Sequence, residues 1–246
     1  MCKLTPDELR NEQQASFVAE ALRDRPRILE VGCGRGDVAR RLASVGFAVT
    51  ALDLEIGDPT PSPGVTFVEG DFLQFDAPLF DAIVFTSSLH HIVPLDQAIK
   101  RAAVLLRPGG RLIVDDFDLE AVDGDTLRWY YDTQALLAAT GLYQDHRGRP
   151  TPANLDPVAR WRTEHLHEPP LHTGAAMRLA ISARFVIREL RRVEYLYRYV
   201  GAGLPADERG AQIAAQVRTI ERARIGDGAL SPIGLRIVAD RATNAV

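Results

Sequence analysis

The sequence has few of the features that mark secreted, membrane or metal-binding proteins. It holds only two cysteines, Cys2 and Cys33, which form neither a disulfide framework nor a zinc motif. No uninterrupted apolar run approaches membrane-spanning length, and the first residues, MCKLTPDELRNEQQ, lack the apolar core of a signal peptide. We therefore expect a cytoplasmic protein without membrane contact.

Basic charge is not in excess either. The 29 lysines and arginines stand against 33 acidic residues, which gives a formal net charge of -4. Nucleic acid is therefore not an expected partner. With 46% hydrophobic and 25% charged residues, the chain has the composition of an ordinary globular protein that can bury a sizeable core.

Short apolar runs and helical patterns alternate between Arg27 and Phe117. The apolar runs are nearly unbroken, as expected for parallel strands that are covered by helices on both faces. The stretch EIGDPTPSPG at 55–64 is too rich in proline and glycine for a full helix. The pattern predicts an α/β fold, whose first five strands lie in RILEV, AVTALDL, GVTFVEGD, DAIVFTS and GRLIVDDF.

The second half of the chain is less regular. We expect a helix in GDTLRWYYDTQALLAATGL, a loop in HRGRPTPANLDP, a strand over the alternating residues 193–199, a helix carrying Ile213, Val217 and Ile220, and a last strand in PIGLRIVAD. No linker separates two domains. The prediction is one domain, with an N-terminal helix in 1–26, a cofactor-binding core in 27–118, an insertion in 119–183, and strands and a helix in 184–246.

The stretch ILEVGCGRG at 28–36 places three glycines on alternate positions directly after an apolar run. In a parallel sheet, the turn after the first strand lies at the ligand-binding crevice. A dinucleotide-binding turn needs a glycine at the sixth position counted from Gly32, where this chain has Asp37, and this acid would repel a pyrophosphate. Glu30 adds a second negative charge. We therefore expect a positively charged adenosine compound as the ligand.

Five motifs in order resemble those of the class I S-adenosylmethionine-dependent methyltransferases, in particular the small-molecule branch with methyltransferase domains of types 11 and 25. They are LEVGCGRG, Asp53 after the second strand, EGDF at 69–72, DAIVFTSSLHH at 81–91 and LLRPGGRLIV at 105–114. The resemblance implies a Rossmann-like, doubly wound sheet of seven mainly parallel strands with the last antiparallel, and an inserted segment over the active site. It also implies methyl transfer from S-adenosylmethionine to a small-molecule acceptor by in-line displacement.

The resemblance places the cofactor-binding residues at the strand ends. The Gly32 carbonyl would accept from the cofactor's ammonium group, which Glu30 would support. Asp53 would accept from both ribose hydroxyls, since one carboxylate has two oxygens, and Asp71 would accept from the adenine amino group. The full expected set is Glu30, Gly32, Gly34, Gly36, Asp53, Leu54, Asp71, Phe72, Thr86 and Ser87.

Histidines are the candidates for a catalytic base. Methyl transfer mainly needs alignment of the acceptor and exclusion of water, but a hydroxyl or ammonium acceptor must also lose a proton. His90, His91 and His172 are the candidates for that role, because histidine exchanges protons near neutral pH. The alternative is that a histidine in this region hydrogen-bonds loop backbone.

The stretch WRTEHLHEPPLH holds three histidines and is expected to line the acceptor pocket. Trp161 or Tyr130 would supply an apolar wall there. A solvated surface is the alternative for the histidines, and a metal site is not expected because two prolines interrupt the segment and no cysteine joins it.

Two further functions stay open at this point. A non-catalytic S-adenosylmethionine-binding regulatory or accessory protein would keep the same pocket, although no cofactor motif looks degraded. A nicotinamide-dependent oxidoreductase is disfavoured by Asp37. The chemical nature of the acceptor and the oligomeric state are not specified by the sequence.

Overall fold

The computed structural model describes residues 4–22, 26–144 and 155–243. Its internal contacts divide the chain into two compact units. The sheet unit comprises Asn11–Phe117, His172–Arg191 and Leu235–Val246, and the helical unit comprises Met1–Arg10, Asp118–Leu171 and Arg192–Gly234. The assignment of all residues to one domain, with an insertion over the active site, stays a prediction.

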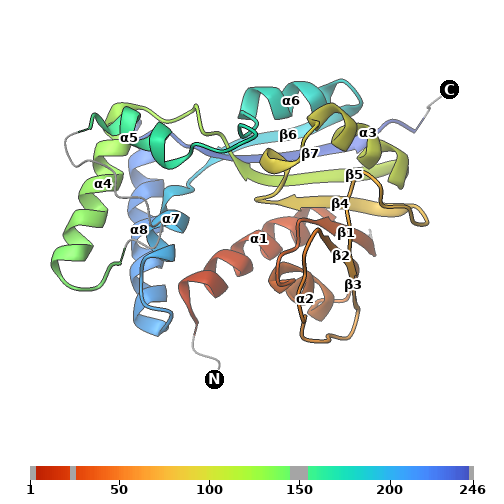
Figure 1. Ribbon diagram of the computed structural model, residues 1–246, viewed down its shortest axis with the longest axis horizontal. Coiled ribbons are helices and arrows are strands. Elements are labelled where there is room, and N and C mark those ends of the chain that lie inside the picture. Colours follow the sequence, from red (N-terminus) through yellow and green to blue (C-terminus); the bar gives the residue numbers. More distant parts are fainter. Residues whose placement is uncertain (1–3, 23–25, 145–154, 244–246) are drawn as a thin grey trace. The chain divides into compact units, whose positions relative to one another are not determined.

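A seven-stranded sheet of order β3-β2-β1-β4-β5-β7-β6 carries the fold (Figure 1). Parallel pairs join β1 to β2 and β4, β2 to β3, and β4 to β5. The last strand is antiparallel and lies between β5 and β6, so the predicted Rossmann-like α/β fold is confirmed. The strands are β1 (Arg27–Val31), β2 (Ala48–Asp53), β3 (Val65–Glu69), β4 (Phe80–Thr86), β5 (Leu106–Phe117), β6 (Phe185–Val193) and β7 (Gly234–Arg241).

Helices cover both faces of the central strands. On one face, side chains of α1 (Pro6–Leu22) and α2 (Asp37–Ser44) pack with Ile28 and Val84. On the other, which carries α3 (Leu95–Leu105) and α6 (Gly174–Ser182) in Figure 1, side chains of these helices pack in one cluster with Leu29 and Phe85. Every residue of β4 is buried, which explains why the sequence of this strand is apolar without alternation.

The helical unit contains α4 (Gly124–Ala139), α5 (Pro157–Glu164), α7 (Leu196–Ala202) and α8 (Glu208–Gly226). Tyr130 and Trp161 are almost fully buried in it, and their rings meet edge to face at 5.9 Å. Asp123 and Asp207 cap the first turns of α4 and α8 by accepting backbone hydrogen bonds.

Most of the predicted elements are confirmed, including the first five strands, the helix after residue 123, the helix that carries Val217 and the last strand. No helix lies between β2 and β3, as the prolines predicted. α5 and α6 were not predicted. β5 begins at Leu106 and thus contains the RPGG sequence that was expected to precede it. Of the loop predicted in HRGRPTPANLDP, residues 146–154 lie outside the described residues.

The strand predicted over residues 193–199 is wrong. β6 ends at Val193, and α7 begins three residues later. The carboxylate of Glu221, which is almost fully buried, accepts hydrogen bonds of 2.8–2.9 Å from the backbone N–H groups of Tyr195, Leu196 and Tyr197. A carboxylate in this position satisfies the donors at a helix start and favours the helix over the extended form that the alternation indicated. Burial raises the pKa of Glu221, and the three donors act against that rise.

Candidate functional site

The turn after β1 requires its glycines. Gly32, Gly34 and Gly36 all have positive φ, at 73°, 53° and 75°. A Cβ on Gly32 would lie 2.4 Å from the Cβ of Ser88, and one on Gly36 would lie 2.3 Å from the ring of Phe67. The turn is therefore shaped by both backbone conformation and close approach.

Asp53 at the end of β2 ties this turn to the neighbouring strand. Its Oδ2 accepts a 2.7 Å hydrogen bond from the backbone N–H of Gly34. The backbone N–H groups of Gly32 and Cys33 donate to the Leu52 carbonyl at 2.8 and 3.1 Å. The hydrogen bond from Gly34 therefore fixes the position of the Asp53 carboxylate, and the carboxylate in turn stabilises the glycine turn.

Glu30 lies beneath the turn with 1% of its surface exposed. Burial raises the pKa of Glu30 to about 7, while a 2.9 Å hydrogen bond from the Thr86 hydroxyl to Oε1 acts in the opposite direction. A cation bound above this carboxylate would favour its ionised form.

Replacing Glu30 by glutamine is expected to change how stability depends on pH. The pKa of Glu30 rises from 4.5 to about 7 on folding, so the folded protein binds more protons than the unfolded chain between these values. The contribution of Glu30 to stability is therefore present below pH 4.5 and is lost as pH rises through 7, by up to about 3 kcal/mol. Thermal unfolding across this range should show a difference between the natural protein and Glu30→Gln that changes with pH. A difference in thermal stability that stays the same across this pH range would contradict the raised pKa of Glu30.

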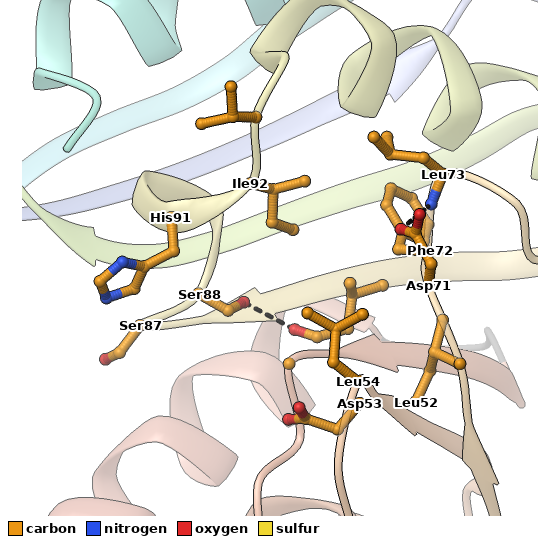
Figure 2. Close-up of a pocket in the computed structure, with 14 residues that line it drawn as sticks. Leu52, Asp53, Leu54, Asp71, Phe72, Leu73, Ser87, Ser88, His91 and Ile92 are labelled. Carbon is orange, nitrogen blue, oxygen red and sulfur yellow. Dashed lines mark hydrogen bonds between the residues drawn. The ribbon is translucent and has the colours of Figure 1, made fainter. Parts of the chain in front are cut away.

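A pocket of about 490 Å³ opens at the carboxyl ends of the first four strands, within the sheet unit (Figure 2). Figure 2 shows Asp53, Asp71 and Ser87 at its border, each from the end of a different strand. Its size is that of a small-molecule site. The lining residues are Val31, Gly32, Leu52, Asp53, Leu54, Gly70, Asp71, Phe72, Leu73, Ser87, Ser88, His91, Ile92 and Val93.

The expected cofactor-binding residues are partly brought together by this pocket. Its lining includes Gly32, Asp53, Leu54, Asp71, Phe72 and Ser87, but not Glu30, Gly34, Gly36 or Thr86. Phe72 is buried and packs edge to face on Phe85 at 5.6 Å. The Asp71 carboxylate accepts from the backbone N–H of Leu73 at 2.9 Å, which holds it at the start of the following turn.

The three candidate histidines are in different positions. His91 lines the pocket. His90 is 5% exposed, and its Nδ1 lies 2.6 Å from Oδ1 of Asp116, an ion-pair distance, although the angle is outside hydrogen-bond geometry. The rings of His90 and His91 are 4.1 Å apart. Asp116 is a site residue that sequence reasoning missed, although the acidic VDDFD at the end of the fifth strand could have indicated it.

His172 binds backbone on both sides of His91. Its backbone N–H donates to the His90 carbonyl and its Nε2 donates to the Ile92 carbonyl, both at 2.9 Å. This arrangement matches the alternative in which a histidine holds the loop, while its role as a base stays a prediction.

The other histidines expected near the acceptor belong to the helical unit. His165 stacks on Trp161 at 3.8 Å between ring centres, and its Nδ1 donates to the Trp161 carbonyl at 2.9 Å. Trp161 and Tyr130 pack inside this unit, so their role as a wall of the acceptor pocket stays a prediction.

The described residues contain neither a candidate metal-binding cluster nor a candidate membrane-spanning helix. Among residues 4–22, 26–144 and 155–243, no cluster of three or more histidine, cysteine or acidic side chains could hold a metal ion. None of the helices within the same ranges is long and apolar enough to cross a membrane.

A protein-family model described as a methyltransferase domain matches residues 7–149. The chain belongs to this methyltransferase family. The match contains all the cofactor motifs identified in the sequence, and it confirms the resemblance to the class I S-adenosylmethionine-dependent enzymes.

Curated methyltransferases are similar to part of this chain. The chain is 35% identical over 107 residues to an uncharacterized methyltransferase of Bacillus cytotoxicus, covering 39% of this chain and 50% of that protein. It is 32% identical over 109 residues to the 27-O-demethylrifamycin SV methyltransferase of Amycolatopsis mediterranei, covering 39% and 40%. The match thus spans half or less of these relatives' length.

A solved structure supports the fold. The 1,6-didemethyltoxoflavin-N1-methyltransferase of Burkholderia thailandensis, crystallised with bound 1,6-didemethyltoxoflavin and S-adenosylhomocysteine, superposes with a TM-score of 0.53 and 19% identity. The superposition covers 96% of this chain and 80% of that one.

Proposed function

We propose that the protein transfers a methyl group from S-adenosylmethionine to a small-molecule acceptor. The observation that carries the proposal is the pocket at the strand ends, which Asp53, Asp71 and the Gly32 backbone line together. The family match over residues 7–149 supports the same activity. The net charge of -4 favours a small molecule over nucleic acid as acceptor.

The residues of the pocket fit this cofactor. Asp53 would accept from the ribose hydroxyls, and Asp71 with the buried Phe72 would hold the adenine. Leu54 and Leu73 add apolar surface on which a base can lie. Glu30 beneath the Gly32 turn favours a cationic ligand over a pyrophosphate, which argues against a nicotinamide dinucleotide.

Methyl transfer requires few chemical steps from the protein itself. S-adenosylmethionine supplies a methyl group on a sulfonium that is already a good leaving group. The chain's own residues bind and orient the two reactants and exclude water. Thr86 ends β4 and Ser87 follows it, where the sulfonium end would lie, and His91 also lines the pocket.

Removal of a proton from the acceptor would fall to a histidine. His91 has the position for direct contact, because it lines the pocket. His90 stands behind it, and its Nδ1 lies 2.6 Å from Oδ1 of Asp116. His172 is the third candidate.

Single replacements distinguish these roles. His91→Ala and His90→Ala are expected to lower the methyl-transfer rate by about 10²-fold or more, with S-adenosylmethionine affinity within about threefold. His172→Gln keeps an N–H donor for the Ile92 carbonyl but cannot act as a base. An unchanged rate in His172→Gln beside a lowered rate in His172→Ala would remove His172 from the base candidates. Parallel loss of rate and affinity would mean that a histidine shapes the cofactor site instead.

The proposal is tested by binding and turnover together. Calorimetry should detect S-adenosylmethionine and S-adenosylhomocysteine but not NAD, and a panel of metabolites should include at least one that is methylated. Binding of NAD alone would refute the proposal. Cofactor binding without transfer to any acceptor would favour a non-catalytic binding protein.

A further inference from the structure

Thr86, the last residue of β4, is hydrogen-bonded to Glu30 on the neighbouring strand β1. Its hydroxyl donates to Oε1 of Glu30 at 2.9 Å. Thr86 is 9% exposed and Glu30 is 1% exposed, and both residues belong to the sheet unit. Thr86 does not line the pocket. The geometry therefore favours an action of this hydroxyl through Glu30 over a direct contact with a ligand.

The second carboxylate oxygen of Glu30 is buried without a hydrogen bond. Among the described residues, Oε2 has no hydrogen-bond partner. A buried carboxylate oxygen of this kind is costly and is often explained by a ligand or ion. Glu30 directly precedes Val31 and Gly32, which both line the pocket. A cationic group bound against these two residues would compensate the charge of the carboxylate.

The Thr86 hydrogen bond is the main influence that keeps Glu30 ionised. Burial raises the pKa of Glu30 to about 7, and the Thr86 hydroxyl lowers it more than the backbone of Ala39 on α2 does. Asp37 on α2 and Asp53 on β2 act in the other direction through charge repulsion. A donor that faces a carboxylate favours the ionised form, which is the form that attracts a cation.

The other polar groups on the elements around β1 add little charge. Burial raises the pKa of Cys33, in the glycine turn, to about 12, so this thiol stays neutral. Asp37 is paired with Arg40 at 2.6 Å. No ion pair with Glu30 exists in the part of the chain that the structure describes. On α1, the buried polar side chains are those of the uncharged Asn11 and Gln14.

We propose that Thr86 is a positioning residue for cofactor binding: its hydroxyl holds the Glu30 carboxylate beside the Gly32 turn, where the carboxylate attracts the ammonium group of S-adenosylmethionine. This inference rests on the proposed function. It gives Thr86 the role of supporting an acidic side chain, in place of a contact at the sulfonium.

The first test compares three ligands by calorimetry. They are S-adenosylmethionine, S-adenosylhomocysteine and methylthioadenosine, which lacks the amino-acid part. Thr86→Val removes the donor and keeps the shape, so it should weaken binding of the first two by about fivefold near pH 7 and change that of methylthioadenosine by less than about twofold. Thr86→Ser keeps the hydroxyl and should bind like the natural protein. Thr50→Val, the same change on β2 outside the pocket lining, should also bind like it.

The second test is the pH dependence of the same affinities. Loss of the donor raises the pKa of Glu30 above its value of about 7, so the carboxylate of Thr86→Val is neutral in more molecules near pH 7. At about pH 9 Glu30 is ionised in both proteins, and the two affinities should agree within about twofold. In a Glu30→Gln background, Thr86→Val should have no further effect, because Thr86 acts only through that carboxylate.

Three outcomes would overturn the role of Thr86. They are an unchanged affinity in Thr86→Val, an affinity loss that is equal near pH 7 and at about pH 9, and an equal loss for methylthioadenosine. Effects of Thr86→Val and Glu30→Gln that multiply would do the same, since Thr86 would then act independently of Glu30.

Thermal unfolding without ligand separates the contact from the proposed function. Glu30 of Thr86→Val keeps its proton to higher pH, so the loss of stability relative to the natural protein should be larger at about pH 9 than at about pH 5. A loss that is the same at both pH values would overturn the link between Thr86 and the charge of Glu30. A natural protein that unfolds as expected but binds none of the three ligands would refute the proposed function, and with it the role in cofactor binding.

Discussion

Asp53→Ala should weaken binding of S-adenosylmethionine by about 1 to 3 kcal/mol, roughly 5- to 150-fold, in calorimetry. The proposed ligand would lose the charged acceptor of two ribose hydroxyls. The glycine turn would lose a support as well, because Asp53 Oδ2 accepts from the Gly34 N–H at 2.7 Å. The two losses act at the same site, so the effect should be among the largest of any single side chain in the pocket.

Asp58→Ala is the matched control for this change. It removes a carboxylate from the connection that follows β2, where Asp58 is exposed and does not line the pocket. Its affinity should stay within about twofold of the natural protein. If Asp53→Ala and Asp58→Ala bind equally well, Asp53 is not a ligand-binding residue.

Gly32→Ala is expected to have the second large effect, on both stability and binding. The new Cβ would lie 2.4 Å from the Cβ of Ser88, and φ at Gly32 is +73°. Either the β1 turn or the wall that carries Ser88 must move, at a cost of about 2 kcal/mol or more, and either movement distorts the pocket. Thermal unfolding and calorimetry measure the two consequences.

Gly46→Ala separates steric overlap from backbone strain. Gly46 also has positive φ, at 101°, but a Cβ there meets nothing within 4 Å, and the residue is outside the pocket lining. This variant should lose about 1 kcal/mol of stability from strain and keep its ligand affinity. Equal losses of stability and affinity in Gly32→Ala and Gly46→Ala would show that contact of the new Cβ with Ser88 is unimportant.

The sequence was sufficient for the parts of this fold that depend on local pattern. The strands β1 and β4 are buried on both faces, and such strands need continuous apolar runs. Gly32 and Asp53 could be placed because parallel strands end at the same edge of a sheet, so that order in the chain gives proximity in space.

Other features depend on residues that are far apart in the chain. Asp116 approaches His90 because β4 and β5 are neighbours, but no spacing in the sequence selects it among the acids at the end of β5. α7 was predicted as a strand because the alternation around Tyr195 was visible, while the buried carboxylate of Glu221, 26 residues later, was not recognised as its cap. Long-range partners of this kind override local preference.

The place of β7 in the sheet has a consequence for the synthesis of the chain. β7 is the last strand in sequence, yet it lies between β5 and β6. During translation the ribosome releases β6 long before the strand that must separate it from β5, so the nascent sheet keeps an open edge at β5. That edge is covered only after β7 has been synthesised, because β7 supplies core residues. They are Leu235, Ile237 and Ala239. Nascent chains that stop before residue 234 would thus expose an unpaired strand to chaperones, proteases and one another.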